Sequence, residues 1–257
     1  MRRRAALVAL TVGTAVLAAC GGDGDADRAE RVRSRPTATT ATTVPTTTPT
    51  VAARATSPVD ALFGVGDAGQ VIAVVADAPG DVTAQLTAYE RTPDGWVQVH
   101  GPWTANLGSA GFAPAGEKRE GDKRTPTGAY DLGFAFGVLA DPGVALEYRR
   151  ITSDAIVWDD DPSSRRYNEW VDTTSQTAGE DPEPMYNPPA YNHGVVIDYN
   201  VERTPGLGSA IFLHVSKGRS TAGCVAIAQS DLVALMRWID PAKRPRIVMG
   251  TRDALLP

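Results

Sequence analysis

Short apolar runs divided by turn residues fill the chain from residue 70 onward. Residues 82–90 (VTAQLTAYE) alternate apolar and polar positions, which is the two-residue period of a strand with one buried face. Proline, glycine and aspartate at 78–81 and 92–95 mark turns on either side of this run. Similar runs predict strands at residues 70–78, 82–90, 96–100, 129–136, 145–151, 194–199, 210–215, 224–227 and 246–249.

One clear helix follows the strand-like runs. Ser230 can cap its start, and the Asp-Pro pair at 240–241 stops it. Its apolar face has the i, i+3, i+4, i+7 spacing of a helix and consists of Leu232, Leu235, Met236 and Ile239. Many short strands with one or two short helices predict a mainly β domain, built as a sandwich or a partly closed barrel.

A long polar stretch with several prolines, residues 159–189, separates two groups of strands. Four aromatic residues are spread along it: Trp158, Tyr167, Trp170 and Tyr186. A long loop in a compact domain is usually functional, so we expect this one to be a lid or a substrate wall.

The first 20 residues have the features of an export signal. Arg2, Arg3 and Arg4 precede an apolar run at 5–19 that is shorter than the about 20 residues a spanning helix needs. The run ends in Leu-Ala-Ala-Cys, which resembles the lipobox of bacterial lipoproteins. The resemblance implies that Cys20 carries lipid and holds the chain at the outer face of the bacterial cell membrane, towards the cell wall. An ordinary secreted protein is the alternative.

Residues 21–57 are rich in threonine and proline and have few large apolar side chains, so we predict a disordered, extended tether. Residues 58–257 then form one domain. Without the three arginines of the signal the chain has 22 basic and 30 acidic residues, a net charge of −8. No basic patch with interleaved aromatic residues is present, which argues against nucleic-acid binding.

The chain has two cysteines, Cys20 and Cys224. If Cys20 carries lipid no disulfide is possible, and an unpaired thiol in an exported protein indicates reactivity. His214 lies in an apolar run ten residues before Cys224, and an imidazole is the usual means of forming a thiolate near neutral pH. Gly223 lets the backbone approach a substrate carbonyl, where amide N–H groups can hold an oxyanion. The alternative is a buried structural cysteine beside a core histidine.

The segment from His214 to Val225 resembles the catalytic signature of the L,D-transpeptidases, the YkuD-like or ErfK-type family of bacterial cell-wall enzymes. That signature is a histidine, a variable loop, and then Ser/Thr-His-Gly-Cys followed by a hydrophobic residue. Residues 121–128 (GDKRTPTG) look like the Thr-Pro-x-Gly element of the family. The likeness covers roughly residues 68–250.

Residues 167–171 and 195–200 look like stretches of the exported branch of the family. Two positions depart from the signature. Ala222 stands where most of the family has histidine, and Ala226 stands where arginine or asparagine is common. The nucleophile, the base and the glycine are retained, so the departures affect donor specificity rather than the chemistry.

The resemblance implies a cysteine acyltransferase that needs no cofactor and no metal. Cys224 attacks the carbonyl between the third and fourth residues of a peptidoglycan stem, His214 acts as general base, and the backbone at Gly223 stabilises the oxyanion. An amine of a neighbouring stem then takes the acyl group and gives a 3→3 cross-link. The resemblance further implies that carbapenem-type β-lactams acylate the thiol, and that a backbone carbonyl orients the histidine.

Further side chains are candidates for substrate contacts. Thr221 is a hydrogen-bonding neighbour of the site. His193 either lines the cleft or lies at a strand edge, Arg124 either binds a substrate carboxylate or lies in a solvated turn, and Trp170 either walls the cleft or anchors the long loop. Asp198 and Asn200 either brace the site or pack at a strand end.

Three other functions fit parts of the pattern. Water in place of the amine gives an L,D-carboxypeptidase or endopeptidase with the same Cys-His site. A wall-binding lipoprotein with weak catalysis is a second possibility. A zinc peptidase using His193, His214 and Cys224 is the third, and it has little support because these residues lack a known zinc spacing.

Overall fold

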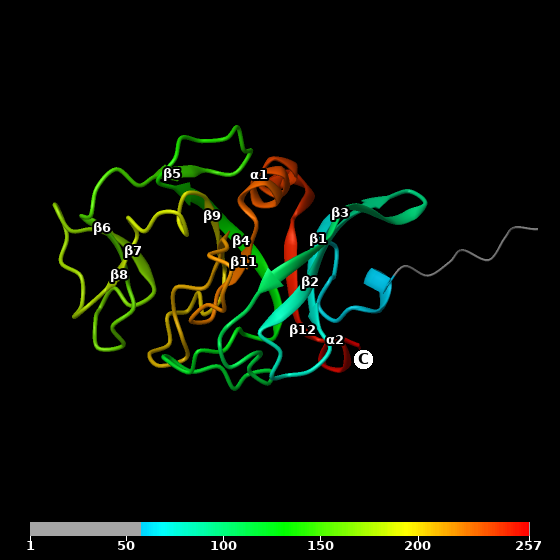
Figure 1. Ribbon diagram of the computed structural model, residues 1–257, viewed down its shortest axis with the longest axis horizontal. Coiled ribbons are helices and arrows are strands. Elements are labelled where there is room, and N and C mark those ends of the chain that lie inside the picture. The colour runs from blue at the N-terminus through cyan, green and yellow to red at the C-terminus, as the bar shows by residue number, and fades with distance from the viewer. Residues whose placement is uncertain (1–57, 257) are drawn as a thin grey trace, which may run out of the picture. The chain divides into compact units, whose positions relative to one another are not determined.

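Eight strands close into a barrel in the computed structural model, which describes residues 58–256 (Figure 1). Pairing between β12 and β4 completes the ring, and β5 (Tyr148–Arg150) extends it outward from β4. Around the ring the strands are β12 (Arg246–Thr251), β1 (Gln70–Ala76), β2 (Thr83–Thr92), β3 (Gly95–Asn106), β11 (Val225–Ile227), β10 (Phe212–Val215), β9 (Gly194–Ile197) and β4 (Gly128–Gly137). The predicted mainly β class is confirmed, and the barrel is closed.

The barrel is of mixed direction. The pairs β1–β12, β10–β11 and β4–β5 are parallel, and the other pairs are antiparallel. Strand β2 keeps the predicted alternation: Ala84, Leu86 and Ala88 are buried in the main core. Strand β1 is buried on both faces because Ile72 and Val74 point into the barrel while Val71 packs with Leu255 on the outside. Because β12 pairs with β4, neither of these strands is left with the unpaired edge that an open sheet would have.

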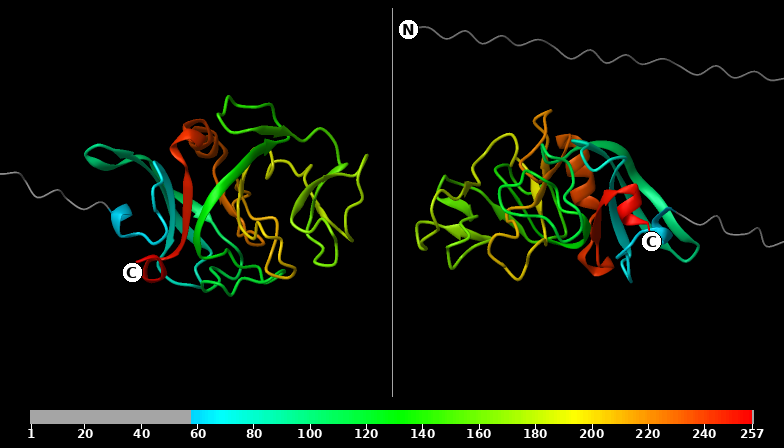
Figure 2. Two further views of the ribbon diagram at one scale, coloured as in Figure 1. Left: turned by 180° about the vertical axis from the view of Figure 1, so that it is seen from behind. Right: turned by 90° about the horizontal axis from the view of Figure 1, so that it is seen from below.

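Helix α1 (Gln229–Trp238) contributes its apolar face to the same core as the barrel strands (Figure 2). Leu232, Leu235 and Met236 are buried as predicted. Ser230 is not the cap: the cap position is Ala228, and the Ser230 hydroxyl instead contacts Asp231 within the first turn. Pro241 ends the helix as expected and begins a 3-10 turn, η2 (Pro241–Lys243). The remaining helices are the short η1 (Pro58–Ala61) and α2 (Arg252–Leu255).

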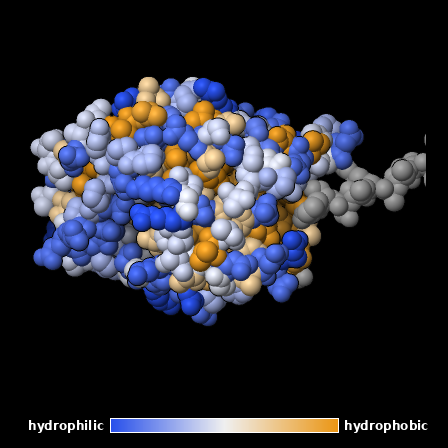
Figure 3. Space-filling view, in the orientation of Figure 1, coloured by the Kyte–Doolittle hydropathy of each residue, from blue (hydrophilic) through white to orange (hydrophobic). Residues whose placement is uncertain are grey.

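The long stretch predicted as a loop contains regular structure. β6 (Ile156–Asp159), β7 (Glu169–Asp172) and β8 (Glu183–Pro184) form a small antiparallel sheet. These three strands are two to four residues long, which is too short for a clear periodic signal in the sequence. In Figure 3 the surface over this sheet is largely hydrophilic, in keeping with its polar composition. The prediction of one long loop over residues 159–189 is therefore wrong at β7 and β8, although this segment does wall the cavity described below.

No helix within residues 58–256 has the length and apolar character needed to cross a membrane. The predicted signal segment, Cys20 and the tether lie outside the described residues.

Candidate active site

His214 lies on β10, and Cys224 immediately precedes the neighbouring parallel strand β11. His214 on β10 is the register partner of Ala226 on β11, and Cys224 lies two residues before Ala226. Because side chains alternate along a strand, positions 224 and 226 share the face to which His214 points. Cys224 and His214 are each 7 % exposed, and they line one cavity of about 680 Å³. The predicted pair is thus brought together.

The Cys224 thiol is held by two backbone groups. Its Sγ donates to the Ala210 carbonyl at 3.2 Å and accepts from the Phe212 N–H at 3.4 Å. Burial raises the pKa of the thiol to about 12, and the Phe212 N–H opposes that rise. The resting group is therefore a protonated thiol, oriented by the chain just before and at the start of β10.

The His214 imidazole is held by the carbonyl of its own neighbour. Nδ1 lies 3.0 Å from the Val215 carbonyl oxygen, which can only accept, so Nδ1 carries the proton and Nε2 has a free lone pair. Burial lowers the pKa of His214 to about 4. The Tyr191 ring packs edge-on against the imidazole with centroids 5.4 Å apart. The result is a neutral, fixed base, and no carboxylate is needed to orient it.

A hydroxyl shapes the turn that presents the thiol. Thr221 Oγ1 donates to the Cys224 carbonyl at 2.7 Å and accepts from the Gly223 N–H at 3.1 Å. Within residues 58–256 the Cys224 N–H has no hydrogen-bond acceptor. The predicted role of Gly223 as an oxyanion donor stays a prediction. For that role the Gly223 N–H would have to leave the Thr221 hydroxyl and donate to the substrate oxygen instead.

Gly223 also has a steric role. Its φ of +153° suits glycine, and a Cβ at this position would lie 2.9 Å from the Arg124 carbonyl oxygen. The element at 121–128 therefore packs against the residue before the nucleophile, which explains how two stretches about 100 residues apart in the sequence shape one site.

Thr221→Val should destabilise the fold by about 1–3 kcal/mol, because it removes both hydrogen bonds of the turn while preserving side-chain shape. Thr221→Ser is the matched control, since it retains the hydroxyl and should remain close to the wild type. Chemical denaturation of the three proteins measures the difference. Equal stability of the valine variant and the wild type would show that the hydroxyl does not hold the turn.

The structure separates the other predicted contacts. Thr221 lines the cavity, as do the two alanines at the departing positions, 222 and 226. The Arg124 side chain is exposed and does not line it; the neighbouring Lys123 does. The prediction that Arg124 meets substrate there is wrong because only its backbone reaches the site, at Gly223.

His193 faces away from the cavity. Gly194 is the register partner of His214, so a side chain one residue earlier leaves on the opposite face. His193 is buried there, with Nδ1 3.2 Å from the Tyr148 hydroxyl. Its predicted place in the substrate cleft is wrong, and the ligand set of the zinc alternative is not brought together.

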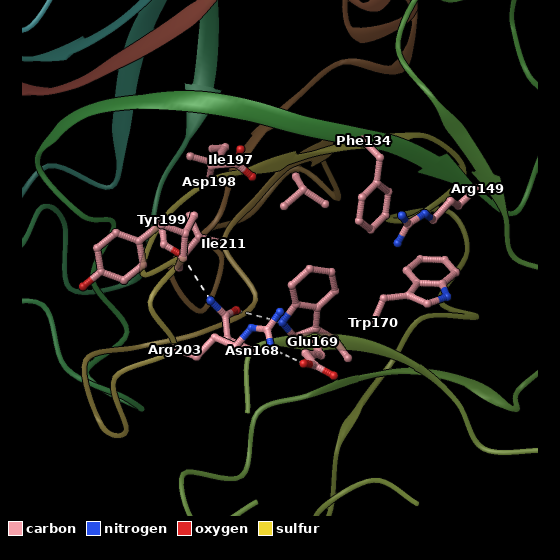
Figure 4. A pocket seen from close by; sticks show the side chains of 13 residues that line it. Phe134, Arg149, Asn168, Glu169, Trp170, Ile197, Asp198, Tyr199, Arg203 and Ile211 are labelled. Atoms are coloured by element: carbon pink, nitrogen blue, oxygen red, sulfur yellow. Dashed lines mark hydrogen bonds and ion pairs between the residues drawn. The ribbon is translucent and has the colours of Figure 1, made fainter. Parts of the chain in front are cut away.

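Trp170 lies on β7 and lines a second cavity of about 420 Å³, shown in Figure 4. Asp198 lines this second cavity too, while the Asn200 side chain binds the carbonyls of Thr204 and Gly208. Neither Asp198 nor Asn200 braces the cysteine site, and Trp170 does not wall it.

Charged residues line the cavity of Cys224 and His214, and sequence reasoning missed most of them. Glu183 from the small sheet accepts from the Tyr191 hydroxyl at 2.9 Å, and burial raises its pKa. Burial raises the pKa of Asp160 to about 6. Basic side chains come from two other segments, and the charged lining as a whole consists of Lys118, Glu120, Lys123, Asp160, Glu183, Lys217 and Arg219. The only sequence signal for Asp160 and Glu183 was their place in the predicted wall.

A family model described as YkuD, L,D-transpeptidase catalytic domain, matches residues 80–249 of the 257-residue chain. No curated protein and no solved structure matches the chain.

Proposed function

Because the chain belongs to the YkuD family of L,D-transpeptidase catalytic domains, we propose that it forms 3→3 cross-links between peptidoglycan stem peptides through a Cys224 thioester. The observation that carries the proposal is that Cys224, just before β11, and His214, on the neighbouring strand β10, line one cavity. A thiol beside a fixed neutral imidazole has the arrangement that nucleophilic acyl transfer needs.

In the acylation step, Cys224 Sγ forms a bond to the carbonyl carbon of the third stem residue while the thiol proton passes to Nε2 of His214. The C–N bond to the fourth residue, a D-alanine, then breaks. The imidazolium returns the proton to the leaving amine. The product of this half-reaction is a thioester on Cys224, with the imidazole neutral again.

The two pKa values decide when the proton moves. The thiol has a pKa of about 12 and the imidazole about 4, so a resting thiolate–imidazolium pair is strongly disfavoured. Proton transfer therefore accompanies attack on a bound carbonyl, rather than preceding it. The oxyanion that forms needs donors, and the Cys224 N–H lies at the nucleophile without a competing acceptor within residues 58–256.

In the second half-reaction, an amine of a neighbouring stem gives its proton to Nε2 of His214 and attacks the thioester carbonyl. The C–S bond breaks, the proton passes to sulfur, and an amide joins the two stems. The mixed charges of the cavity support this pair of substrates. Lys123 and Arg219 suit stem carboxylates, and the carboxyl groups of Asp160 and Glu183 can accept hydrogen bonds from the incoming amine.

We also propose where the protein works. Cys20, at the end of the lipobox-like run, is lipidated and anchors the chain to the outer face of the membrane. Residues 21–57 then tether the domain within reach of the cell wall. Retention of the chain in the membrane fraction by wild type, and its release by Cys20→Ala, tests this arrangement.

The test of the reaction is to incubate the purified full chain with a disaccharide tetrapeptide and analyse the products by mass spectrometry. The expected product is a dimer that has lost one D-alanine and is linked between third residues. A tripeptide monomer without dimer would identify water as the acceptor and the protein as a carboxypeptidase. Unchanged substrate, from a folded chain, would overturn the proposal.

A further inference from the structure

The second cavity lies between the small sheet and the barrel and is walled by aromatic rings (Figure 4). Phe134 of β4 meets Trp170 edge-on with centroids 5.6 Å apart, and Trp158 of β6 lies 6.3 Å from Phe134. The volume of about 420 Å³ falls in the range of small-molecule sites, about 300–1,000 Å³.

The wall is held in place by Asn168. Its Oδ1 accepts from the Trp158 indole N–H and from the Ala210 N–H, at 2.9 and 3.2 Å. Its Nδ2 donates to the carbonyls of Tyr199 and Asn200. One amide side chain thus joins the small sheet to the loop before β10. The cavity is therefore formed before any ligand arrives.

Polar groups of both signs face this aromatic wall. The Arg149 guanidinium lies 3.6 Å from the Phe134 ring centroid, and across the cavity stands Asp198 (Figure 4). The Asp198 carboxyl is partly buried and its side chain makes no hydrogen bond to any residue in 58–256; burial raises its pKa. Arg203 and Glu169 complete the set as an ion pair. Two guanidinium groups and two carboxyl groups balance, so an ion of one sign gains little here.

We propose that this cavity binds a neutral pyranose ring of a glycan strand. The partly exposed Trp170 ring can pack against the apolar C–H face of such a ring, since Arg149 lies over the Phe134 ring and Trp158 is buried. Each sugar hydroxyl both donates and accepts, which matches the donors of Arg149 and the acceptors of Asp198. Ile211 lines both cavities, which makes them neighbours, as a glycopeptide with its stem at Cys224 and its sugar here requires. The identification of this sugar as part of the glycan that carries the stem peptide rests on the proposed function.

The test is binding of a β-1,4-linked N-acetylglucosamine tetramer to the full chain, measured by titration calorimetry. Wild type should bind, and Trp170→Ala and Asp198→Ala should each raise the Kd at least tenfold. Trp170→Phe should keep part of the affinity because it retains a ring. The matched control is Trp96→Ala, which removes a partly exposed tryptophan near Arg91 on the β2–β3 hairpin and should bind as the wild type does. Near-ultraviolet circular dichroism reports whether each variant is folded.

Absence of binding by the wild type, or equal affinity in folded Trp170→Ala and Asp198→Ala, would overturn the inference. If these variants instead weaken binding of a sugar-free stem tetrapeptide, the cavity is a peptide subsite and the inference is wrong. Acylation of wild-type Cys224 by a carbapenem is measured separately. Sugar binding without acylation would count against the proposed function and leave the sugar site standing.

Discussion

Cys224→Ala should form no covalent adduct with a carbapenem and no cross-linked product, while the wild type gains the mass of one drug molecule. Removing the nucleophile of a catalytic pair costs on the order of 10⁴-fold or more in rate. The effect is large because Cys224 supplies the thiol in the cavity that His214 lines, and the neighbouring Thr221 hydroxyl is already engaged with the Cys224 carbonyl and the Gly223 N–H. Intact-mass spectrometry of the purified full chain measures the adduct, and the muropeptide assay measures the product.

The second cysteine supplies the control for this experiment. Cys20→Ala keeps the catalytic cavity intact and should acquire the same adduct as the wild type. An adduct that persists on Cys224→Ala and disappears from Cys20→Ala would show that the drug reacts with an accessible thiol elsewhere. That result would remove Cys224 from the role of nucleophile.

His214→Gln should slow acylation about 10²–10⁴-fold, the usual contribution of a general base. The wild-type rate should also fall at low pH. Because burial places the pKa of His214 at about 4, the imidazole is neutral and competent above that value and becomes protonated below it. The rate should therefore be level from pH 7 down to about pH 5 and decline as the pH passes through 4. Stopped-flow measurement of carbapenem acylation across this range gives the profile.

His193→Gln is the matched control, since it removes another buried histidine that faces Tyr148 rather than the cavity. It should keep the rate and the low-pH decline of the wild type. A decline centred near pH 6.5 in the wild type would mean that His214 is not held in the buried, neutral state. Loss of the low-pH decline in His193→Gln would show that the titrating group is His193 and not His214.

The strand pattern predicted most of the barrel, and its failures have physical causes. The sequence predicts a strand over residues 96–100, yet β3 continues to Asn106 in its pairing with β2, through register shifts near Leu86 and Ala88. Closure of the barrel through β12 and β4 was not predictable, since it depends on pairing between residues more than 100 positions apart.

The part of the cysteine site whose residues lie close together in the chain was predictable. Thr221, Gly223 and Cys224 form one turn, and His214 precedes them on the adjacent strand. Contacts that depend on strand register or on how the small sheet packs were not. His193 looked suited to the cleft until register placed it on the opposite face, and nothing in the sequence tied Glu183 to Tyr191.

The buried resting state of Cys224 has a consequence for chemical durability. Oxidants attack thiolates rather than thiols, and the oxidised sulfinic and sulfonic forms are not restored by simple reductants. With a pKa of about 12, only about one molecule in 10⁵ holds a thiolate at pH 7. Peroxide should therefore inactivate the idle protein slowly, and sulfur becomes strongly nucleophilic only while a substrate carbonyl draws its proton onto His214. Burial of the thiol can in this way keep Cys224 reduced without a disulfide partner.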